Sequence, residues 1–204
     1  MHRRQLLTLP ALALVAAHQA RAQAPAGPVL TRVDTALGAF VIAVDPARAA
    51  VTVANYLAYV DQRWLDGGKV YRIVTSANQP ADTLHKIQVV QWGMDLPDGQ
   101  EPPIPAIEHE TTQQSGLLHR NGTVSMARST PGTAASEYFI CIGDQPELDF
   151  GGRRNPDGQG FAAFGQVVEG MTVVQAIYRK AQAEQYLKTP IVVRSVRRVA
   201  ATSR

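Results

Sequence analysis

The stretch NGTVSMARSTPGTAASEYFICI, residues 121–142, decides which fold the chain is expected to adopt. It contains two short apolar runs, residues 123–128 and 138–142, which are typical of β-strands. The segment between them is small and polar, and its Pro131 and Gly132 favour a turn. The stretch therefore predicts two neighbouring strands, with an aromatic side chain and small residues placed to wall a shallow apolar groove.

Strand-like sequence continues on both sides of this stretch. Apolar or alternating runs between turn residues predict six more strands, at residues 29–35, 40–44, 69–75, 86–93, 161–168 and 191–199. Apolar stripes at helical spacing predict two helices, at residues 52–65 and 171–181. Polar loops are expected at residues 76–85 and 143–160. The mostly hairpin-like connections argue against a parallel sheet.

Eight strands can close into a barrel whose interior is just filled by side chains and which leaves no unpaired edge. We therefore expect a mainly β fold, a closed eight-stranded antiparallel barrel capped by two α-helices, with any site on its outer face. The chain of 204 residues, 45% hydrophobic and 18% charged, suits one globular domain, which we place at residues 29–200.

The N-terminus has the pattern of an export signal, which we place at residues 1–22. Arg3 and Arg4 precede the apolar run 6–17, and Ala22 ends a small-x-small cleavage site. The paired arginines are compatible equally with a twin-arginine signal and with an ordinary one. Cleavage would remove three of the 20 basic residues and leave 17, equal to the 17 acidic ones, so the charge gives no indication of a nucleic-acid partner. Residues 23–28 are expected to form a flexible lead-in.

No pattern in the sequence indicates a metal or a cofactor. The single cysteine, Cys141, lies in an apolar run and is interpreted as a packing residue, not a nucleophile. The spacing of His109 and His119 fits no common zinc pattern, so both are interpreted as surface histidines. Four further polar residues in the 143–160 loop are interpreted as turn formers: Asp144, Asp149, Asn155 and Asp157.

Several ordered motifs make the chain resemble the cyclophilin-type peptidyl-prolyl cis-trans isomerases, from about Thr31 to Val199. The most specific are GTVSMAR at 122–128, SEYFI at 136–140 and FAAFGQVVEGM at 161–171. TVANY at 52–56, VYRI at 70–73 and VQWG at 90–93 are similar to further family motifs. The chain looks closest to exported bacterial members, and the resemblance implies the same eight-stranded barrel with two helices.

The resemblance places Arg72 at the family's catalytic arginine and Gln91 at a position that supports it or binds the substrate backbone. A guanidinium is always charged and presents a planar fork of donors, which suits the polarisation of a prolyl amide. Without the surrounding motifs, Arg72 would read as a solvated strand arginine and Gln91 as an ordinary strand glutamine.

The resemblance also implies the substrate groove. Phe139 would form the floor of a proline pocket, with Leu148, Phe161, Val89 and Met126 around it, although Met126 is the one of these best suited to the core. Ala127 and Arg128 would offer backbone groups to an extended peptide. Glu137 could accept a hydrogen bond from the substrate but could not donate one.

Departures from the family pattern leave an alternative open. They are Tyr71 for histidine, Val89 for methionine, Glu137 for glutamine, Glu147 where some members have tryptophan, and Phe161 for histidine. They motivate a second hypothesis, a proline-peptide binding or chaperone module with little turnover; a structural role in a larger assembly is a remote third.

The expected partners are proline-containing segments of unfolded or partly folded exported proteins, met in the bacterial periplasm. We expect a monomer that needs no cofactor or metal, binds no nucleic acid and is not stably inserted in a membrane after the signal is removed.

Overall fold

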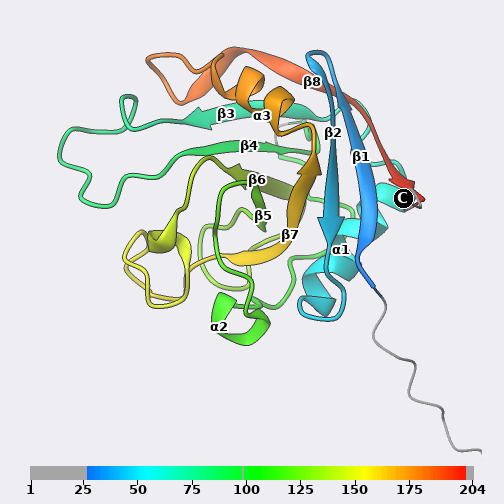
Figure 1. The fold of residues 1–204 in the computed structure, drawn as a ribbon, viewed down its shortest axis with the longest axis horizontal. Coiled ribbons are helices and arrows are strands. Elements are labelled where there is room, and N and C mark those ends of the chain that lie inside the picture. The colour runs from blue at the N-terminus through cyan, green and yellow to red at the C-terminus, as the bar shows by residue number, and fades with distance from the viewer. Residues whose placement is uncertain (1–26, 98, 201–204) are drawn as a thin grey trace, which may run out of the picture.

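In the computed structural model, which describes residues 27–97 and 99–200, eight antiparallel strands form a closed barrel in the order β1-β2-β7-β5-β6-β4-β3-β8 (Figure 1). The strands are β1 (Val29–Thr35), β2 (Gly38–Val44), β3 (Lys69–Val74), β4 (Val89–Gly93), β5 (Thr123–Met126), β6 (Glu137–Cys141), β7 (Ala162–Glu169) and β8 (Tyr186–Val199). The helices are α1 (Ala50–Asp61), α2 (Thr112–Ser115) and α3 (Met171–Tyr178), with a 3-10 turn η1 at Pro146–Leu148. The predicted export signal, residues 1–22, lies outside the described residues.

The predicted barrel is confirmed, but several elements differ from the prediction: α1 spans Ala50–Asp61 instead of residues 52–65, and β4 begins at Val89 instead of residue 86. The helix α2 was not expected; it begins at a capping box in which Thr111 and Gln114 satisfy each other's backbone N–H groups. Strand β8 begins at Tyr186, not at residue 191, and its first part pairs with β3 opposite Arg72. This part of β8 is largely exposed and contains Pro190, so it carries no apolar alternation that could have predicted it.

Alternation of side chains along the strands divides the apolar residues into two clusters. On β6, Tyr138 and Ile140 point into the barrel, whereas Phe139 and Cys141 point outward. The inner cluster fills the barrel, and Tyr56 of α1 joins it with its ring centroid 5.2 Å from that of Tyr138. The outer cluster is smaller and consists of Val74, Ile87, Val89, Phe139, Cys141 and Leu148. Two predictions are confirmed: Cys141 is buried, and the barrel interior is filled by packed apolar side chains.

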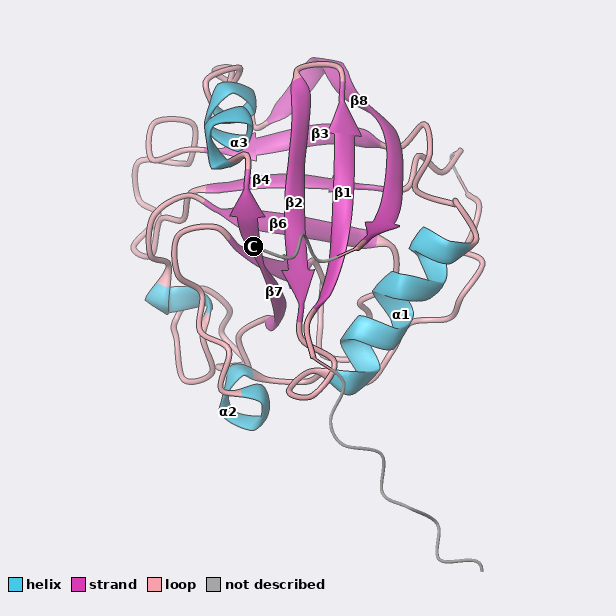
Figure 2. Cartoon of the chain, turned by 45° about the vertical axis from the view of Figure 1, so that its right-hand side comes forward, coloured by secondary structure: helices cyan, strands magenta, loops and turns pink. Residues whose placement is uncertain are grey.

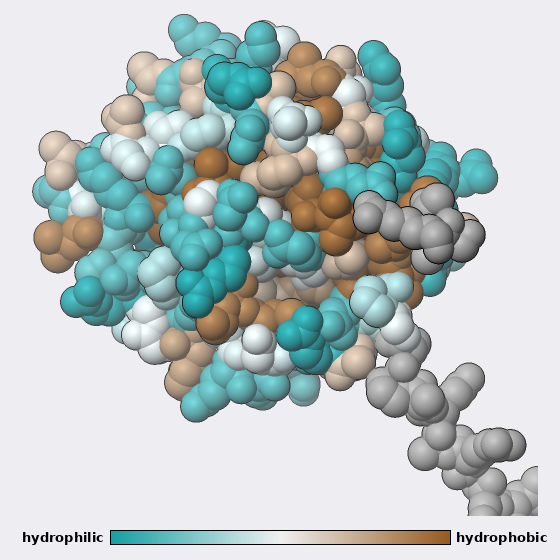
Figure 3. Space-filling model, in the orientation of Figure 1, coloured by the Kyte–Doolittle hydropathy of each residue, from teal (hydrophilic) through white to brown (hydrophobic). Residues whose placement is uncertain are grey.

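Helices α1 and α3 lie on different sides of the barrel (Figure 2), and each buries its apolar stripe. The outer surface is mixed: Figure 3 shows small hydrophobic patches separated by polar side chains over the face in view. The most exposed large hydrophobic residue of the described chain is Leu84, which is 89% exposed in the loop between β3 and β4. Within residues 27–97 and 99–200, the helices are too short or too polar to cross a membrane.

The start of α1 is capped by a residue far away in the sequence. Its N-cap, Ala49, has no side chain that can accept a hydrogen bond. Instead the carboxylate of Glu110 accepts from the backbone N–H of Val51 at 3.1 Å and from that of Thr52 at 2.7 Å, and from the Thr52 hydroxyl at 2.6 Å. A negative charge at this end of a helix is also favoured by the helix dipole. Glu110 therefore ties the segment before α2 to α1.

We expect Glu110→Ala to lower the free energy of unfolding by about 1–2 kcal/mol, because α1 loses its cap and a charge that complements its dipole. Urea denaturation at neutral pH measures the change. The matched control is Glu108→Ala, which removes an exposed carboxylate from the same segment and should change stability by less than about 0.5 kcal/mol. Equal losses in the two variants would contradict the capping role.

Candidate active site

A β-bulge in β3 places two consecutive side chains on the outer face of the barrel. Val70 pairs with Trp92 and Arg72 pairs with Gln91, so Tyr71 is an extra residue without a partner on β4. Val70 and Ile73 both remain buried in the barrel. Without the extra residue, regular alternation would point the side chain of Arg72 into the barrel, as it does that of Val70 two residues earlier. The bulge therefore brings both Tyr71 and Arg72 to the outside, beside Gln91.

Three hydrogen bonds hold the guanidinium of Arg72. Its Nη1 donates to Oε1 of Gln91 at 3.0 Å, and its Nε donates to Oε1 of Gln185 at 3.0 Å. Its Nη2 also donates to Oε1 of Gln185. The ring of Tyr186 lies beneath the guanidinium, 5.6 Å from its central carbon. Three of the five guanidinium N–H groups are used in this way, which leaves two for a ligand.

The amide of Gln91 is oriented by two neighbours. Its Nε2 donates to the hydroxyl of Tyr71 and, at 3.2 Å, to Oε2 of Glu137. The Tyr71 hydroxyl in turn donates to the same oxygen of Glu137 at 2.7 Å. Burial and the charge of Glu137 raise the pKa of Tyr71, so this hydroxyl stays protonated and remains a donor. With Nε2 engaged, Oε1 of Gln91 faces Arg72. Two departures noted in the sequence, Tyr71 and Glu137, thus form one contact.

An apolar hollow adjoins Arg72 and Gln91 on the outer face. Phe139 forms its floor, and the ring of Phe161 meets that of Phe139 edge-on at 5.3 Å. Eleven residues line the hollow: Arg72, Ile87, Val89, Gln91, Ala127, Arg128, Phe139, Leu148, Arg154, Asn155 and Phe161. A second, more polar hollow shares Arg72, Gln91, Ala127 and Arg128 with the first and includes Glu137. Together the two hollows form one groove.

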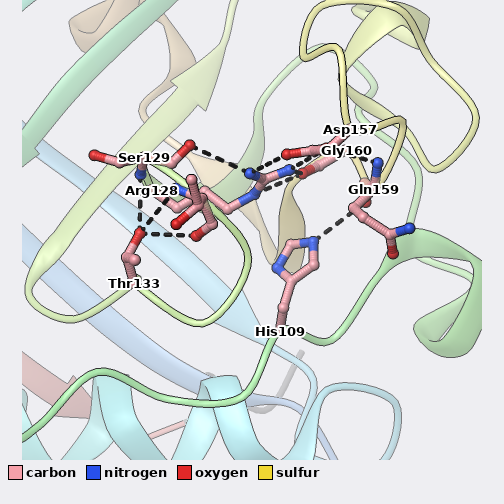
Figure 4. A network of polar contacts seen from close by, with 8 residues as sticks. His109, Arg128, Ser129, Thr133, Asp157, Gln159 and Gly160 are labelled. Atoms are coloured by element: carbon pink, nitrogen blue, oxygen red, sulfur yellow. Dashed lines mark hydrogen bonds and ion pairs between the residues drawn. The ribbon is translucent and has the colours of Figure 1, made fainter.

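Arg128 closes one wall of the groove through its side chain. Its guanidinium, 1% exposed, pairs with Asp157 at 2.9 Å and donates to the carbonyl of Gly160 (Figure 4). It also lies 5.1 Å from the centroid of the Phe161 ring. Asp157, interpreted from the sequence as a turn former, therefore anchors the 143–160 loop through Arg128 to the segment that follows β5.

His109 points up to the same loop from below in Figure 4, with Nε2 3.2 Å from the carbonyl oxygen of Gln159. It is half-buried, and burial lowers its pKa.

The interpretation of His119 as a surface residue is wrong. It is 1% exposed and its ring stacks on that of Phe139, with centroids 5.9 Å apart. Its Nδ1 lies 2.7 Å from Oδ1 of Asp149, and its Nε2 lies 3.0 Å from Oγ of Ser125. Because a carboxylate can only accept, Nδ1 carries a proton. Ser125 is fully buried, so this serine–histidine–aspartate set offers no nucleophile to a substrate and serves to support Phe139.

Met126 does not belong to the groove, which corrects its assignment as a substrate-binding residue. Its side chain is 1% exposed and packs in the inner cluster. The alternation of β5 explains this, because Ser125 points outward and Met126 must then point inward. The other predicted residues lie together: Arg72, Gln91, Val89, Ala127, Arg128, Phe139, Leu148 and Phe161 line the first hollow, and Glu137 lines the second.

Sequence reasoning missed Gln185, Tyr186 and Arg154. Tyr186 is the first residue of β8 and Gln185 immediately precedes it, and the pairing of β8 with β3 brings both to Arg72. Arg154 lies in the 143–160 loop, where a polar arginine gives no signal of its own. The loop at 76–85 is linked to Arg72 through Gln185, whose Nε2 donates to the carbonyl of Asn78 at 3.2 Å.

Comparison with known proteins gives concordant matches. A model of the family described as cyclophilin type peptidyl-prolyl cis-trans isomerase matches residues 30–198. Peptidyl-prolyl cis-trans isomerase cyp18 of Streptomyces antibioticus is 34% identical over 146 residues, 71% of this chain and 80% of the relative. Peptidyl-prolyl cis-trans isomerase A of Dickeya dadantii is 31% identical over 144 residues, 70% of this chain and 67% of the relative.

Among solved structures, a cyclophilin type peptidyl-prolyl cis-trans isomerase of Cryptosporidium parvum superposes with a TM-score of 0.68. The match covers 85% of this chain and 99% of that one at 15% identity, and it bears on the fold alone.

We expect His119→Ala to lower the free energy of unfolding by about 2–4 kcal/mol, because it removes a buried ring and leaves Ser125 and Asp149 short of a partner. Urea denaturation gives the value. The control is His109→Ala, which loses a half-buried ring with one hydrogen bond and should cost less than about 1 kcal/mol. A His119→Ala variant as stable as the control would refute the supporting role.

Proposed function

The chain belongs to the cyclophilin-type peptidyl-prolyl cis-trans isomerases, and we propose that it speeds rotation about the bond before proline by placing the Arg72 guanidinium against the prolyl amide. The observation that carries this proposal is the position of Arg72. It stands at the edge of an apolar hollow, held by Gln91 and Gln185, with two N–H groups left over.

A hydrogen-bond donor near the prolyl nitrogen is the main chemical requirement for faster rotation about the amide bond. The barrier to rotation is about 20 kcal/mol because the amide is stabilised by resonance. In the twisted state that resonance is lost and the prolyl nitrogen becomes basic, so a donor close to it stabilises this state selectively. Lowering the barrier by about 7 kcal/mol would speed the rotation by about five powers of ten. No covalent bond needs to form or break.

The groove supplies the rest of the proposed mechanism. The apolar hollow over Phe139, between Leu148 and Phe161, would seat the proline ring. The neighbouring polar hollow would hold the adjoining backbone, with Ala127 and Arg128 between the two. The N–H of Ala127 already donates to the carbonyl of Glu137 at 2.9 Å, so Ala127 can offer only its carbonyl oxygen to a peptide.

The cellular part of the proposal rests on the sequence. The arginine pair, the apolar run 6–17 and the small-residue cleavage pattern support export, which points to the periplasm and to exported, partly folded proteins as substrates. The near-equal numbers of acidic and basic residues after cleavage support a partner other than nucleic acid. We propose that the protein acts as a monomer.

We expect Arg72→Ala to lower kcat/KM at least a hundredfold, because a preorganised charged donor is lost from the transition state. The kcat/KM of Arg72→Lys should lie between those of wild type and Arg72→Ala, because an ammonium group keeps the charge but cannot bind both glutamines and the substrate at once. Exchange NMR on an Ala-Pro peptide measures the rates. Arg32→Ala is the control, an exposed strand arginine paired with Asp34 on β1.

The same measurement separates the isomerase from the binding module. If wild type binds the peptide without accelerating exchange, or if Arg72→Ala keeps more than half of the wild-type rate, the proposed role of Arg72 is wrong.

We expect Gln185→Ala to lower kcat about three- to tenfold with little change in KM, because Arg72 loses the acceptor that fixes two of its nitrogens. Circular dichroism and urea denaturation would verify that the fold is kept. Gln182→Ala is the control: the side chain of this exposed glutamine accepts one hydrogen bond, from the backbone N–H of Lys188, and makes no contact with Arg72 among the hydrogen bonds of the described residues. If Gln185→Ala and Gln182→Ala changed kcat and KM to the same extent, that result would argue against the positioning role of Gln185.

A further inference from the structure

Two guanidinium groups in the groove lack an acidic partner. In the described part of the chain, no carboxylate oxygen forms an ion pair with Arg72 or with Arg154, yet both residues line the hollow over Phe139. The third arginine of the hollow, Arg128, is neutralised by Asp157 at 2.9 Å. The neighbouring Arg153 is also paired, with Glu147 at 3.1 Å, and its side chain is 71% exposed.

Arg154 is held in place by neutral oxygens. Its Nη1 donates to Oε1 of Gln79 at 3.1 Å and to the carbonyl of His85 at 3.0 Å. Both acceptors lie in the loop between β3 and β4, which extends on the same side of the molecule as the 143–160 loop in Figure 1. A side chain tied at one nitrogen keeps its other N–H groups for a ligand.

The electrostatics of this end of the groove favour an anion. None of the eleven residues that line the hollow is Asp or Glu. Burial lowers the pKa of Arg154, and the positive charge of Arg72 nearby lowers it further. The side-chain nitrogen of Asn155, at the same wall, has no acceptor among the described residues. An acidic group bound here would balance this positive charge and supply acceptors.

The opposite end of the groove carries a negative charge. Glu137 lies in the second hollow, where Tyr71 and Gln91 donate to its carboxylate. An acidic substrate group placed there would meet a like charge. The groove is therefore polarised along its length, cationic beside the proline seat and anionic beyond Gln91.

We propose that Arg154 selects substrates that carry a carboxylate on a residue adjoining the proline, at the end of the hollow where Arg72 adds to the positive charge. The inference rests on the proposed function, because it assumes that the proline ring occupies the hollow over Phe139. Arg154 acts as a specificity-determining residue in it, and the loop 76–85 serves to hold Arg154.

Three peptides of one sequence test the proposal: Gln-Pro-Gln, Glu-Pro-Gln and Gln-Pro-Glu at their centres. Exchange NMR at low ionic strength gives the rate for each, and chemical-shift titration gives each affinity separately. We expect wild type to favour one of the Glu peptides over the Gln peptide about three- to tenfold in kcat/KM. Which one is favoured tells whether the carboxylate precedes or follows the proline. High salt should reduce the preference.

The variant Arg154→Gln should bring the Glu/Gln ratio close to one. Arg153→Gln is the matched control, because it removes the same charge from the next residue but outside the hollow, and it should keep the ratio within a factor of two. An equal collapse in both variants overturns the proposal, since it would reveal a long-range field instead of a contact.

The outcome also separates this inference from the proposed function. Acceleration of all three peptides without a preference overturns the selectivity and leaves the isomerase mechanism standing. If no peptide is accelerated, the isomerase mechanism is overturned and the affinities test the anion site separately. Tighter binding of a Glu peptide that is lost in Arg154→Gln supports the anion site, and equal binding of the Glu and Gln peptides overturns it.

Discussion

A closed sheet allows each strand side chain only two environments, the filled interior or the outer face. In this barrel the interior is filled by the large apolar cluster that includes Tyr56, Tyr138 and Trp92. The site must therefore be built on the outside, from residues of the opposite phase on β4 and β6 such as Gln91 and Phe139. Everything else in the groove is arranged around this constraint.

The position of Arg72 shows how the constraint is met. Strict alternation would turn this residue inward, and one extra residue in β3 changes its phase. Its anchors are two neutral amides, those of Gln91 and Gln185, so the guanidinium is fixed without being neutralised. A carboxylate in either place would hold the arginine equally well but would cancel much of the field that a prolyl nitrogen could feel. The same choice of neutral acceptors is repeated at Arg154.

Much of this could be predicted from the sequence, because the relevant signals are local. Apolar and alternating runs located all eight strands except the first part of β8, and the apolar stripes located α1 and α3. The motifs around Arg72, Gln91 and Phe139 pointed to three residues that the structure brings together around one hollow. The assignments that failed, Met126 and His119, are cases in which a pattern reveals that residues alternate but does not reveal which phase faces the core or what lies over the surface.

By itself, then, the sequence determined the type of fold and indicated most of the residues that line the hollow, because strand periodicity and motif spacing depend on near neighbours along the chain. Only the tertiary structure decided that Gln185 anchors Arg72 and that Arg154 joins it in the groove. Arg72 and Gln185 are more than a hundred residues apart in the sequence, and Arg154 and Gln79 lie in two different irregular loops. They depend on a bulge and on strand pairing, and neither leaves a periodic trace in the residues that take part.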